Sequence, residues 1–214
     1  MNLEFFIEKH KHSIKSFLEP YPWNPKMIER KYLFIHVPKT AGTSILHAME
    51  LERYDRIHLN WRVYEQSNRF FFNTFFKFAV VRHPLDRISS VYNYLIQGGG
   101  NQDLRLSNHL NKKAPSFEKF ILDYLTPSKI MLHNLFRSQS FFLCDESGTI
   151  KVDYILKFET LDKDFQLVSD KIGFSIKKLP VKNMSKNLIN KVSFEAKEKI
   201  RYLYEDDFHI FNYE

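Results

Sequence analysis

A short loop between two predicted elements carries the residue types that bind phosphate. Val37-Pro38-Lys39-Thr40-Ala41-Gly42-Thr43-Ser44 separates an apolar run from a segment with helical spacing. The N–H groups of a helix's first turn attract anions, and Gly42 allows the backbone to approach a ligand closely. Thr43 and Ser44 add hydroxyl donors, and Lys39 adds a point charge. This pattern predicts a phosphate site formed by Lys39, Thr40, Ala41, Gly42, Thr43 and Ser44.

The order of these residues differs from that of a Walker loop. A Walker loop has the pattern Gly-x-x-x-x-Gly-Lys-Ser/Thr, whereas here Lys39 precedes Gly42. The alternative interpretation is a purely structural turn, in which Thr43 or Ser44 caps the following helix.

A second segment places an arginine and a serine on either side of a predicted helix start. Arg82 ends the apolar run Phe78-Ala79-Val80-Val81, and Pro84 is well placed to begin a helix in which Ser90 lies two turns along. Parallel α/β sheets bind ligands at the carboxyl ends of their strands. If the chain reverses at Pro84, Arg82 and Ser90 reach one phosphate, with Arg82 as a forked donor. Arg87 is predicted to be a solvated helix residue or an ion-pair partner.

Short apolar runs alternate with segments of helical spacing along most of the chain. Runs that suit buried strands cover residues 32–37, 55–59, 78–82 and 153–158. Helices are predicted within residues 3–18, 44–52, 63–75, 84–96, 116–124, 130–136, 160–172 and 194–204, and loops over residues 98–115 and 179–188. This alternation predicts an α/β, P-loop-like three-layer fold with a central, mainly parallel β-sheet flanked by helices.

The length of 214 residues favours a single domain. We expect residues 1–30 to form an N-terminal helix and a proline-rich linker, and residues 31–214 to form the core. Lysine and arginine number 32 against 25 acids, a net charge of +7 that attracts anionic ligands.

The cysteine count and the N-terminus bear on the compartment. The single cysteine, Cys144, excludes an internal disulfide and a cysteine-cluster zinc site, and it fits a reducing compartment. The N-terminus carries acids where a signal peptide needs basic residues, and no apolar run approaches the ~20 residues of a membrane span. We therefore expect a cytoplasmic protein with no transmembrane segment.

Together, the two phosphate-binding segments resemble the motifs of the sulfotransferases that use 3′-phosphoadenosine 5′-phosphosulfate (PAPS). In that family a Pro-Lys-Thr/Ser-x-x-Thr/Ser-Ser/Thr-type loop holds the 5′-phosphosulfate, and an Arg-x-Pro-x-x-Arg-x-x-Ser segment holds the 3′-phosphate. Residues 37–44 and 82–90 are similar to these motifs in order and spacing. Weaker similarity continues in residues 139–143, 152–161, 179–185 and 204–208. The pattern is most similar to the carbohydrate branch, which contains the chondroitin, dermatan and heparan 2-O enzymes.

The resemblance implies transfer of a sulfuryl group from PAPS to a hydroxyl group, expected on a carbohydrate, without a metal. The chain has neither the membrane anchor nor the lumenal disulfides of Golgi members, so it resembles a minimal, cytosolic, microbial version. Lys39 suits stabilisation of the leaving phosphate. In the family a polar, basic loop closes over the nucleotide, which implies that Ser185 or Lys186 lies near the 3′-phosphate. No nucleic-acid partner is expected, and the sequence does not predict an oligomeric state.

The acceptor proton requires a base, and histidine titrates nearest to physiological pH. Among nine histidines, His58 ends the second predicted strand, at the same sheet edge as Lys39 and Arg82. In the resembled branch a histidine in this segment acts as the base. His133 is the second candidate, and His83 is placed to flank the 3′-phosphate.

Three other functions remain open. A nucleoside or small-molecule kinase would use a similar loop but needs a Walker lysine and a magnesium-binding carboxylate. A nucleic-acid-binding module would explain the positive charge and the aromatic residues, yet the phenylalanines lie mostly in apolar runs that indicate core. The third is a nucleotide-binding protein without catalytic activity.

Overall fold

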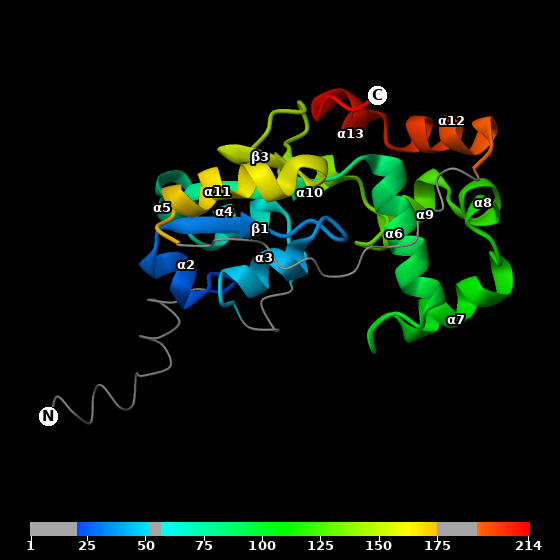
Figure 1. Ribbon diagram of the computed structural model, residues 1–214, viewed down its shortest axis with the longest axis horizontal. Coiled ribbons are helices and arrows are strands. Elements are labelled where there is room, and N and C mark those ends of the chain that lie inside the picture. The colour runs from blue at the N-terminus through cyan, green and yellow to red at the C-terminus, as the bar shows by residue number, and fades with distance from the viewer. Residues whose placement is uncertain (1–20, 52–56, 175–191) are drawn as a thin grey trace, which may run out of the picture.

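The computed structural model describes three stretches of the chain, residues 21–51, 57–174 and 192–214 (Figure 1). Within them, one parallel sheet contains three strands in the order β1 (Tyr32–Ile35), β2 (Phe76–Val81) and β3 (Tyr154–Lys157). Phe34 lies opposite Phe78, which lies opposite Tyr154. All of β1 and most of β2 are buried, as expected for strands covered on both faces.

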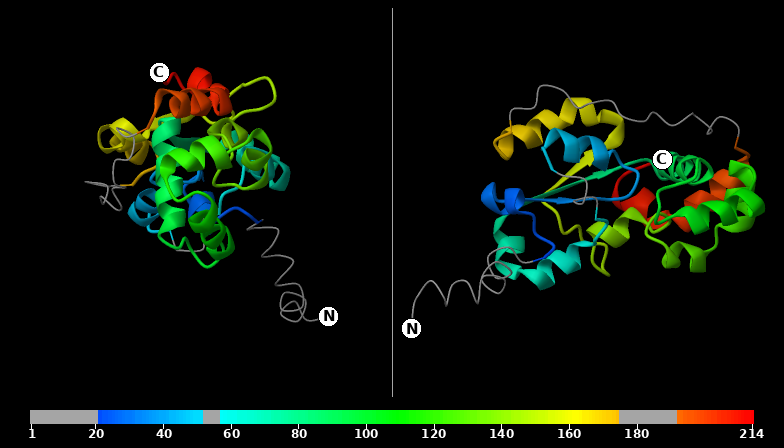
Figure 2. Two further views of the ribbon diagram at one scale, coloured as in Figure 1. Left: turned by 90° about the vertical axis from the view of Figure 1, so that its right-hand side faces the viewer. Right: turned by 90° about the horizontal axis from the view of Figure 1, so that it is seen from below.

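Helices cover both faces of this sheet. In the right-hand view of Figure 2, α3 (Gly42–Ala48) and α11 (Leu161–Lys171) lie on one face, and α4 (Trp61–Ser67) and α5 (Arg69–Thr74) lie on the other. One apolar cluster packs these layers together, with members that include Phe34, Ile45, Phe72, Val80 and Phe165. The predicted α/β class, a parallel sheet flanked by helices, is confirmed.

A second group of helices extends from the sheet (Figure 1). It consists of α6 (Pro84–Ile96), α7 (Leu104–Lys113), α8 (Phe117–Lys119), the π-helical turn η2 (Phe120–Tyr124), α9 (Pro127–Leu132) and α12 (Phe194–Leu203). These helices share their own apolar cluster, with members that include Ile88, Leu95, Leu110, Phe120 and Ile200. The other described elements are α2 (Pro25–Glu29), α10 (Gln139–Leu143), the 3-10 turn η3 (Phe158–Thr160) and α13 (Glu205–Ile210).

The predicted strand over residues 55–59 is wrong for residues 57–59, the part that the structure describes. Side chains rather than a strand ladder hold this segment. His58 Nδ1 lies 2.9 Å from the His36 carbonyl oxygen, and Asn60 caps α4 by accepting a hydrogen bond from the Val63 N–H. The single helix predicted within residues 63–75 is two helices, because the Asn68 side chain caps a new start at α5.

The predicted loop over residues 98–115 is also wrong in part, because α7 occupies most of it. Burial of Leu110 and a hydrogen bond from the Ser107 hydroxyl to the Leu95 carbonyl oxygen fix this helix against α6. The predicted helix at residues 3–18 and the predicted loop at residues 179–188 both lie outside the described residues. In the part of the chain that is described, no helix is long and apolar enough to cross a membrane.

Candidate functional site

The loop after β1 makes a tight turn before α3. Lys39 and Ala41 both have a positive φ, 67° and 71°, a conformation that costs a non-glycine residue about 1–2 kcal/mol. The Thr40 hydroxyl is buried and donates a hydrogen bond to the Val37 carbonyl oxygen at 2.9 Å, which closes the turn. The side chain of Thr40 is therefore used inside the loop, and only its backbone remains to meet a ligand.

Gly42, the first residue of α3, lies against the side chain of His36. A Cβ atom at position 42 would lie 1.8 Å from His36 Nε2, so this close approach requires glycine. The next two residues, Thr43 and Ser44, are half-buried and buried, respectively. The loop residues predicted to bind phosphate are thus gathered beyond the carboxyl end of β1.

The Lys39 side chain crosses from this loop to α6. Its ammonium nitrogen lies 4.4 Å from the centroid of the Tyr94 ring, within the range of a cation–π contact. The pKa of Lys39 is lowered to about 8, because burial and, to a smaller extent, the charge of Arg82 lower it more than the charge of Asp103 raises it. Lys39 and Arg82 are therefore close enough to repel one another.

Arg82 is the first residue beyond β2, and Gln139 holds its backbone. The Arg82 N–H donates to Gln139 Oε1 and the Arg82 carbonyl oxygen accepts from Gln139 Nε2, both at 2.8 Å. The guanidinium carbon lies 4.2 Å from the centroid of Phe158. The Nε atom of Arg82 is buried and has no hydrogen-bond partner among the described residues. An unpaired buried donor is unfavourable, so a phosphate oxygen that accepted from it would be stabilised.

Ser90 is buried on α6, four residues before Tyr94. Residues four apart lie on the same face of a helix, so Ser90 faces the side on which Tyr94 meets Lys39. Ser185 and Lys186, the other predicted contacts of the nucleotide, lie outside the described residues.

Two of the segments of weak similarity, residues 139–143 and 204–208, meet next to Arg82. Asp207 of α13 is wholly buried, and its carboxylate oxygens accept hydrogen bonds from the backbone N–H groups of Gln139 and Ser140, both at 2.8 Å. Because Gln139 in turn binds Arg82, these segments support the end of β2.

His58 holds its proton on the nitrogen that faces the protein. A carbonyl oxygen can only accept, so the 2.9 Å contact with the His36 carbonyl places the proton on Nδ1 and leaves the lone pair on Nε2. Burial lowers the pKa of His58, which keeps the ring neutral at pH 7. Its ring centroid lies 4.3 Å from that of His36.

His133 has the opposite arrangement. The Leu135 N–H donates to His133 Nδ1 at 3.2 Å, and His133 Nε2 lies 3.3 Å from Asp103 Oδ1. Both ring nitrogens of His133 therefore face partners within the protein. At His83, the Nε2 atom lies 3.1 Å from the carbonyl oxygen of Glu214.

Sequence reasoning missed three polar residues around these side chains, Tyr94, Asp103 and Gln139. Tyr94 and Gln139 act on residues far away in the chain, and Asp103 acts on Tyr94 nine residues earlier. The available signals were the glycine run just before Asp103 and the weak similarity at residues 139–143. The prediction of a solvated Arg87 is wrong. This side chain is wholly buried, and it donates hydrogen bonds to the carbonyl oxygens of Leu135 and Arg137.

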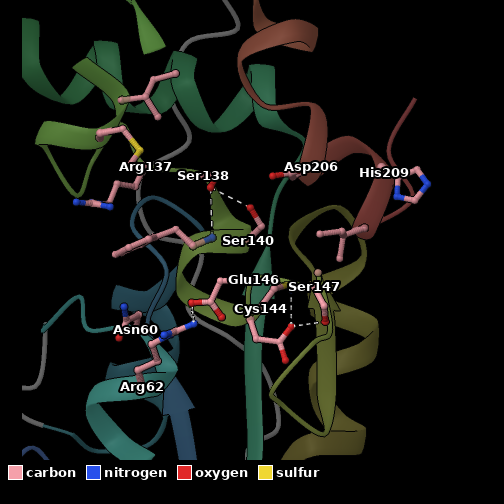
Figure 3. Close-up of a pocket in the computed structure, with 16 residues that line it drawn as sticks. Asn60, Arg62, Arg137, Ser138, Ser140, Cys144, Glu146, Ser147, Asp206 and His209 are labelled. Carbon is pink, nitrogen blue, oxygen red and sulfur yellow. Dashed lines mark hydrogen bonds and ion pairs between the residues drawn. The ribbon is translucent and has the colours of Figure 1, made fainter. Parts of the chain in front are cut away.

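A cavity of about 670 Å³ lies beside the segment that carries His58 (Figure 3). Its lining residues come from the start of α4, from α9, from residues 137–148 and from α13. The Asn134 side chain, between α9 and Arg137, donates to the His58 carbonyl oxygen at 3.2 Å and so links this connection to the segment of His58. Arg62 pairs with Glu146, whereas Arg137 stacks 3.9 Å from the centroid of Phe141 and forms no ion pair with a described residue.

Across the three described stretches, no group of three histidine, cysteine, aspartate or glutamate side chains could hold a metal ion. The model of the sulfotransferase family matches residues 28–214 of the chain. No curated protein and no solved structure matches the chain. The match covers most of the chain and includes both predicted phosphate-binding segments, so this protein belongs to the sulfotransferase family, whose members catalyse sulfuryl transfer.

Proposed function

We propose that this protein transfers a sulfuryl group from PAPS to a hydroxyl group of a carbohydrate. One observation carries the proposal: Lys39 and Arg82 lie beyond the ends of neighbouring strands, close enough to repel, and neither forms an ion pair with a described residue. Two partly buried cations without a bound carboxylate suit a ligand with several negative charges.

The proposed nucleotide contacts divide between the two segments. Lys39, the hydroxyl of Thr43 and the backbone from Thr40 to Ser44 would hold the 5′-phosphosulfate. Arg82 and Ser90 would hold the 3′-phosphate, and the unpaired Nε of Arg82 fits an oxygen acceptor. We retain Ser185 and Lys186 as further proposed contacts. Bound PAPS supplies the sulfuryl group.

Lys39 would act on the charge that develops during transfer. An ammonium fixed beside the bridging oxygen stabilises the transition state more than the ground state, because negative charge grows there as the bond breaks. The turn of the loop and the Tyr94 ring hold this ammonium in place, so little reorganisation is required.

His58 would accept the proton of the acceptor hydroxyl. It is neutral, and Nε2 carries the lone pair, which are the two requirements for a base at pH 7. His133 is less suitable, because its Nδ1 lone pair already accepts from the Leu135 N–H.

The acceptor would occupy the cavity whose lining begins at Asn60, two residues after His58. Polar side chains and the Phe141 ring line it together, a combination that suits a sugar with both hydroxyl groups and apolar faces. Arg137 offers forked donors to an acidic group if the carbohydrate carries one.

Nucleotide binding tests the proposal. Calorimetry should show that 3′-phosphoadenosine 5′-phosphate (PAP) binds more tightly than ATP. Arg82→Ala should weaken PAP about 10- to 100-fold, the loss expected for a charged hydrogen bond, and should weaken adenosine 5′-phosphosulfate much less, because that nucleotide lacks the 3′-phosphate. The exposed Arg69→Ala is the matched control. Equal losses for both nucleotides would contradict the role of Arg82, and preference for ATP would favour a kinase. Mass spectrometry of a carbohydrate panel incubated with PAPS then identifies the sulfated acceptor.

A further inference from the structure

Asp103, the residue before α7, has both carboxylate oxygens engaged in the protein. Its Oδ2 accepts a hydrogen bond from the Tyr94 hydroxyl at 2.9 Å, and its Oδ1 lies 3.3 Å from His133 Nε2. The side chain is only 16% exposed. A carboxylate held at two points in a partly buried place has a fixed direction relative to its neighbours.

Tyr94 connects the fixed Asp103 carboxylate to Lys39. Its hydroxyl donates to Asp103 and accepts from the Gly100 N–H at 2.6 Å, so two hydrogen bonds fix the hydroxyl end of the ring. The ammonium of Lys39 lies over this ring, 4.4 Å from its centroid. The ring therefore forms a fixed platform for the lysine of the phosphate loop.

The glycine run before Asp103 allows the chain to turn back so that Asp103 reaches the Tyr94 hydroxyl. Gly98 and Gly99 have positive φ values, 105° and 62°, and the turn they make returns the chain towards Tyr94. A Cβ atom on Gly99 would lie 3.0 Å from Asp103 Cβ, and one on Gly100 would lie 2.9 Å from the Tyr94 hydroxyl. Side chains at these positions would strain the turn or collide with Asp103 and Tyr94, so the contact between Asp103 and Tyr94 requires the glycine run.

Four groups from different elements determine the electrostatics at Lys39. Arg82 from the end of β2 repels the ammonium, Tyr94 from α6 attracts it through its ring, and Asp103 attracts it through charge. His58 lies within electrostatic reach of both Lys39 and Asp103. Among these four, Asp103 is the only negative charge.

We propose that Asp103, acting through Tyr94, is a positioning residue that fixes the Lys39 ammonium in the phosphate loop and offsets its repulsion from Arg82. This inference rests on the proposed function, because it assigns Lys39 to the nucleotide. It also explains how Lys39 retains its charge beside Arg82 before the nucleotide arrives. The pKa of Lys39, about 8, already includes the favourable charge of Asp103, so loss of that charge would lower it further.

The first test measures Lys39 without any nucleotide. Competitive acetylation of the lysines from pH 6 to 10, read by mass spectrometry, reports the pH at which Lys39 becomes reactive. Asp103→Asn should move this midpoint down by about half to one pH unit, because a neutral amide no longer favours the ammonium. The exposed Asp162→Asn, which removes the same charge from the start of α11, should leave it unchanged.

The second test measures PAP affinity by calorimetry between pH 7.5 and 9.5, where phosphate groups are fully ionised. The wild-type affinity should fall as Lys39 loses its proton, and Lys39→Met should abolish this fall. Asp103→Asn should begin to lose affinity at lower pH, which makes binding about three- to tenfold weaker than wild type at pH 8.5. Tyr94→Phe retains the ring and the Asp103 charge, so it should weaken binding without moving the pH dependence.

Two results would overturn the inference. One is an unchanged acetylation midpoint in Asp103→Asn. The other is an equal loss of PAP affinity at every pH together with a lower melting temperature, which a merely structural role predicts. A wild-type protein that binds no PAP but shows the acetylation shift would instead contradict the proposed function, while leaving the link between Asp103 and Lys39 intact.

Discussion

His58 and His133 hold their protons on opposite ring nitrogens, and this difference decides which of them is suited to be a base. Nδ1 of His58 faces a carbonyl oxygen, whereas Nδ1 of His133 accepts from an N–H group. A single backbone partner thus determines where the lone pair of each ring is available.

Replacement of the base should slow turnover without harming the fold. His58→Ala should reduce kcat by ~10²–10⁴, the usual effect of losing a general base, while PAP affinity changes little and the lost contact with the His36 carbonyl lowers the melting temperature by only a few degrees. Stopped assays with the identified acceptor, beside the exposed control His47→Ala, make the comparison. Near-normal turnover in His58→Ala would exclude it as the base.

The protonation of His58 should determine how kcat/KM falls at acidic pH. Burial lowers the pKa of His58 below its usual 6.5, and only the neutral ring can accept a proton. The value of kcat/KM, which reports the free enzyme, should therefore remain high at pH 6.5 and fall only below it. A profile that already falls above pH 7 would contradict this assignment.

At the scale of elements, α10 and α13 act together as a support for the end of β2. Asp207 of α13 binds the first N–H groups of α10, and Gln139 of α10 binds both backbone polar groups of Arg82. The Gln139 amide takes the place that a neighbouring strand would fill beyond Val81, where β2 ends. A short helix thereby fixes the direction of an arginine 57 residues away in the chain.

Gln139→Met tests this support because it preserves the size of the side chain and removes its two hydrogen bonds. We expect a loss of about 1–3 kcal/mol in the free energy of unfolding from unsatisfied backbone groups. PAP affinity should fall more than that of adenosine 5′-phosphosulfate, because Arg82 is displaced. The exposed Gln166→Met is the matched control. A similar loss for both nucleotides would separate Gln139 from the 3′-phosphate contact.

At the scale of the whole molecule, the proposed nucleotide site lies where two apolar cores meet. Lys39 and Arg82 extend from the ends of strands packed in one core, whereas Ser90 and Tyr94 belong to α6, which packs in the other. Asp103 joins them from the segment before α7. Neither core contains the site alone, so its geometry depends on how the sheet and the helical group pack.

Lys39 should also reduce the stability of the whole protein. Its pKa is about 8 when folded and near 10.5 when unfolded, so below pH 8 the folded state holds an unfavourable charge. Between pH 8 and 10.5 the folded state releases the proton first, and stability rises with pH. Lys39→Met should therefore stabilise the protein by about 1–3 kcal/mol at pH 7, with little gain left above pH 10.

Urea unfolding at pH 7 and at pH 10 measures this difference, with the exposed Lys112→Met as control. A Lys39→Met variant that is less stable than wild type at pH 7 would show that the contact with Tyr94 outweighs the burial of charge.

Local sequence determined the strands at residues 32–35, 76–81 and 154–157, the α/β class and the two family motifs. These features depend on apolar runs and on neighbours a few residues apart, which a linear pattern displays directly. The same reasoning failed at residues 57–59, because apolar spacing does not reveal that the His58 and Asn60 side chains bind backbone instead of a strand ladder.

Tertiary structure decided the rest of the site. The links of Lys39 to Tyr94, of Tyr94 to Asp103 and of Arg82 to Gln139 depend on the packing of helices against the sheet, as does the burial of Arg87. Which nitrogen of a histidine carries the proton depends likewise on the partner that packing brings to the ring. The type of a side chain determines which hydrogen bonds it can donate or accept. Only the folded chain places a partner within about 3 Å of it.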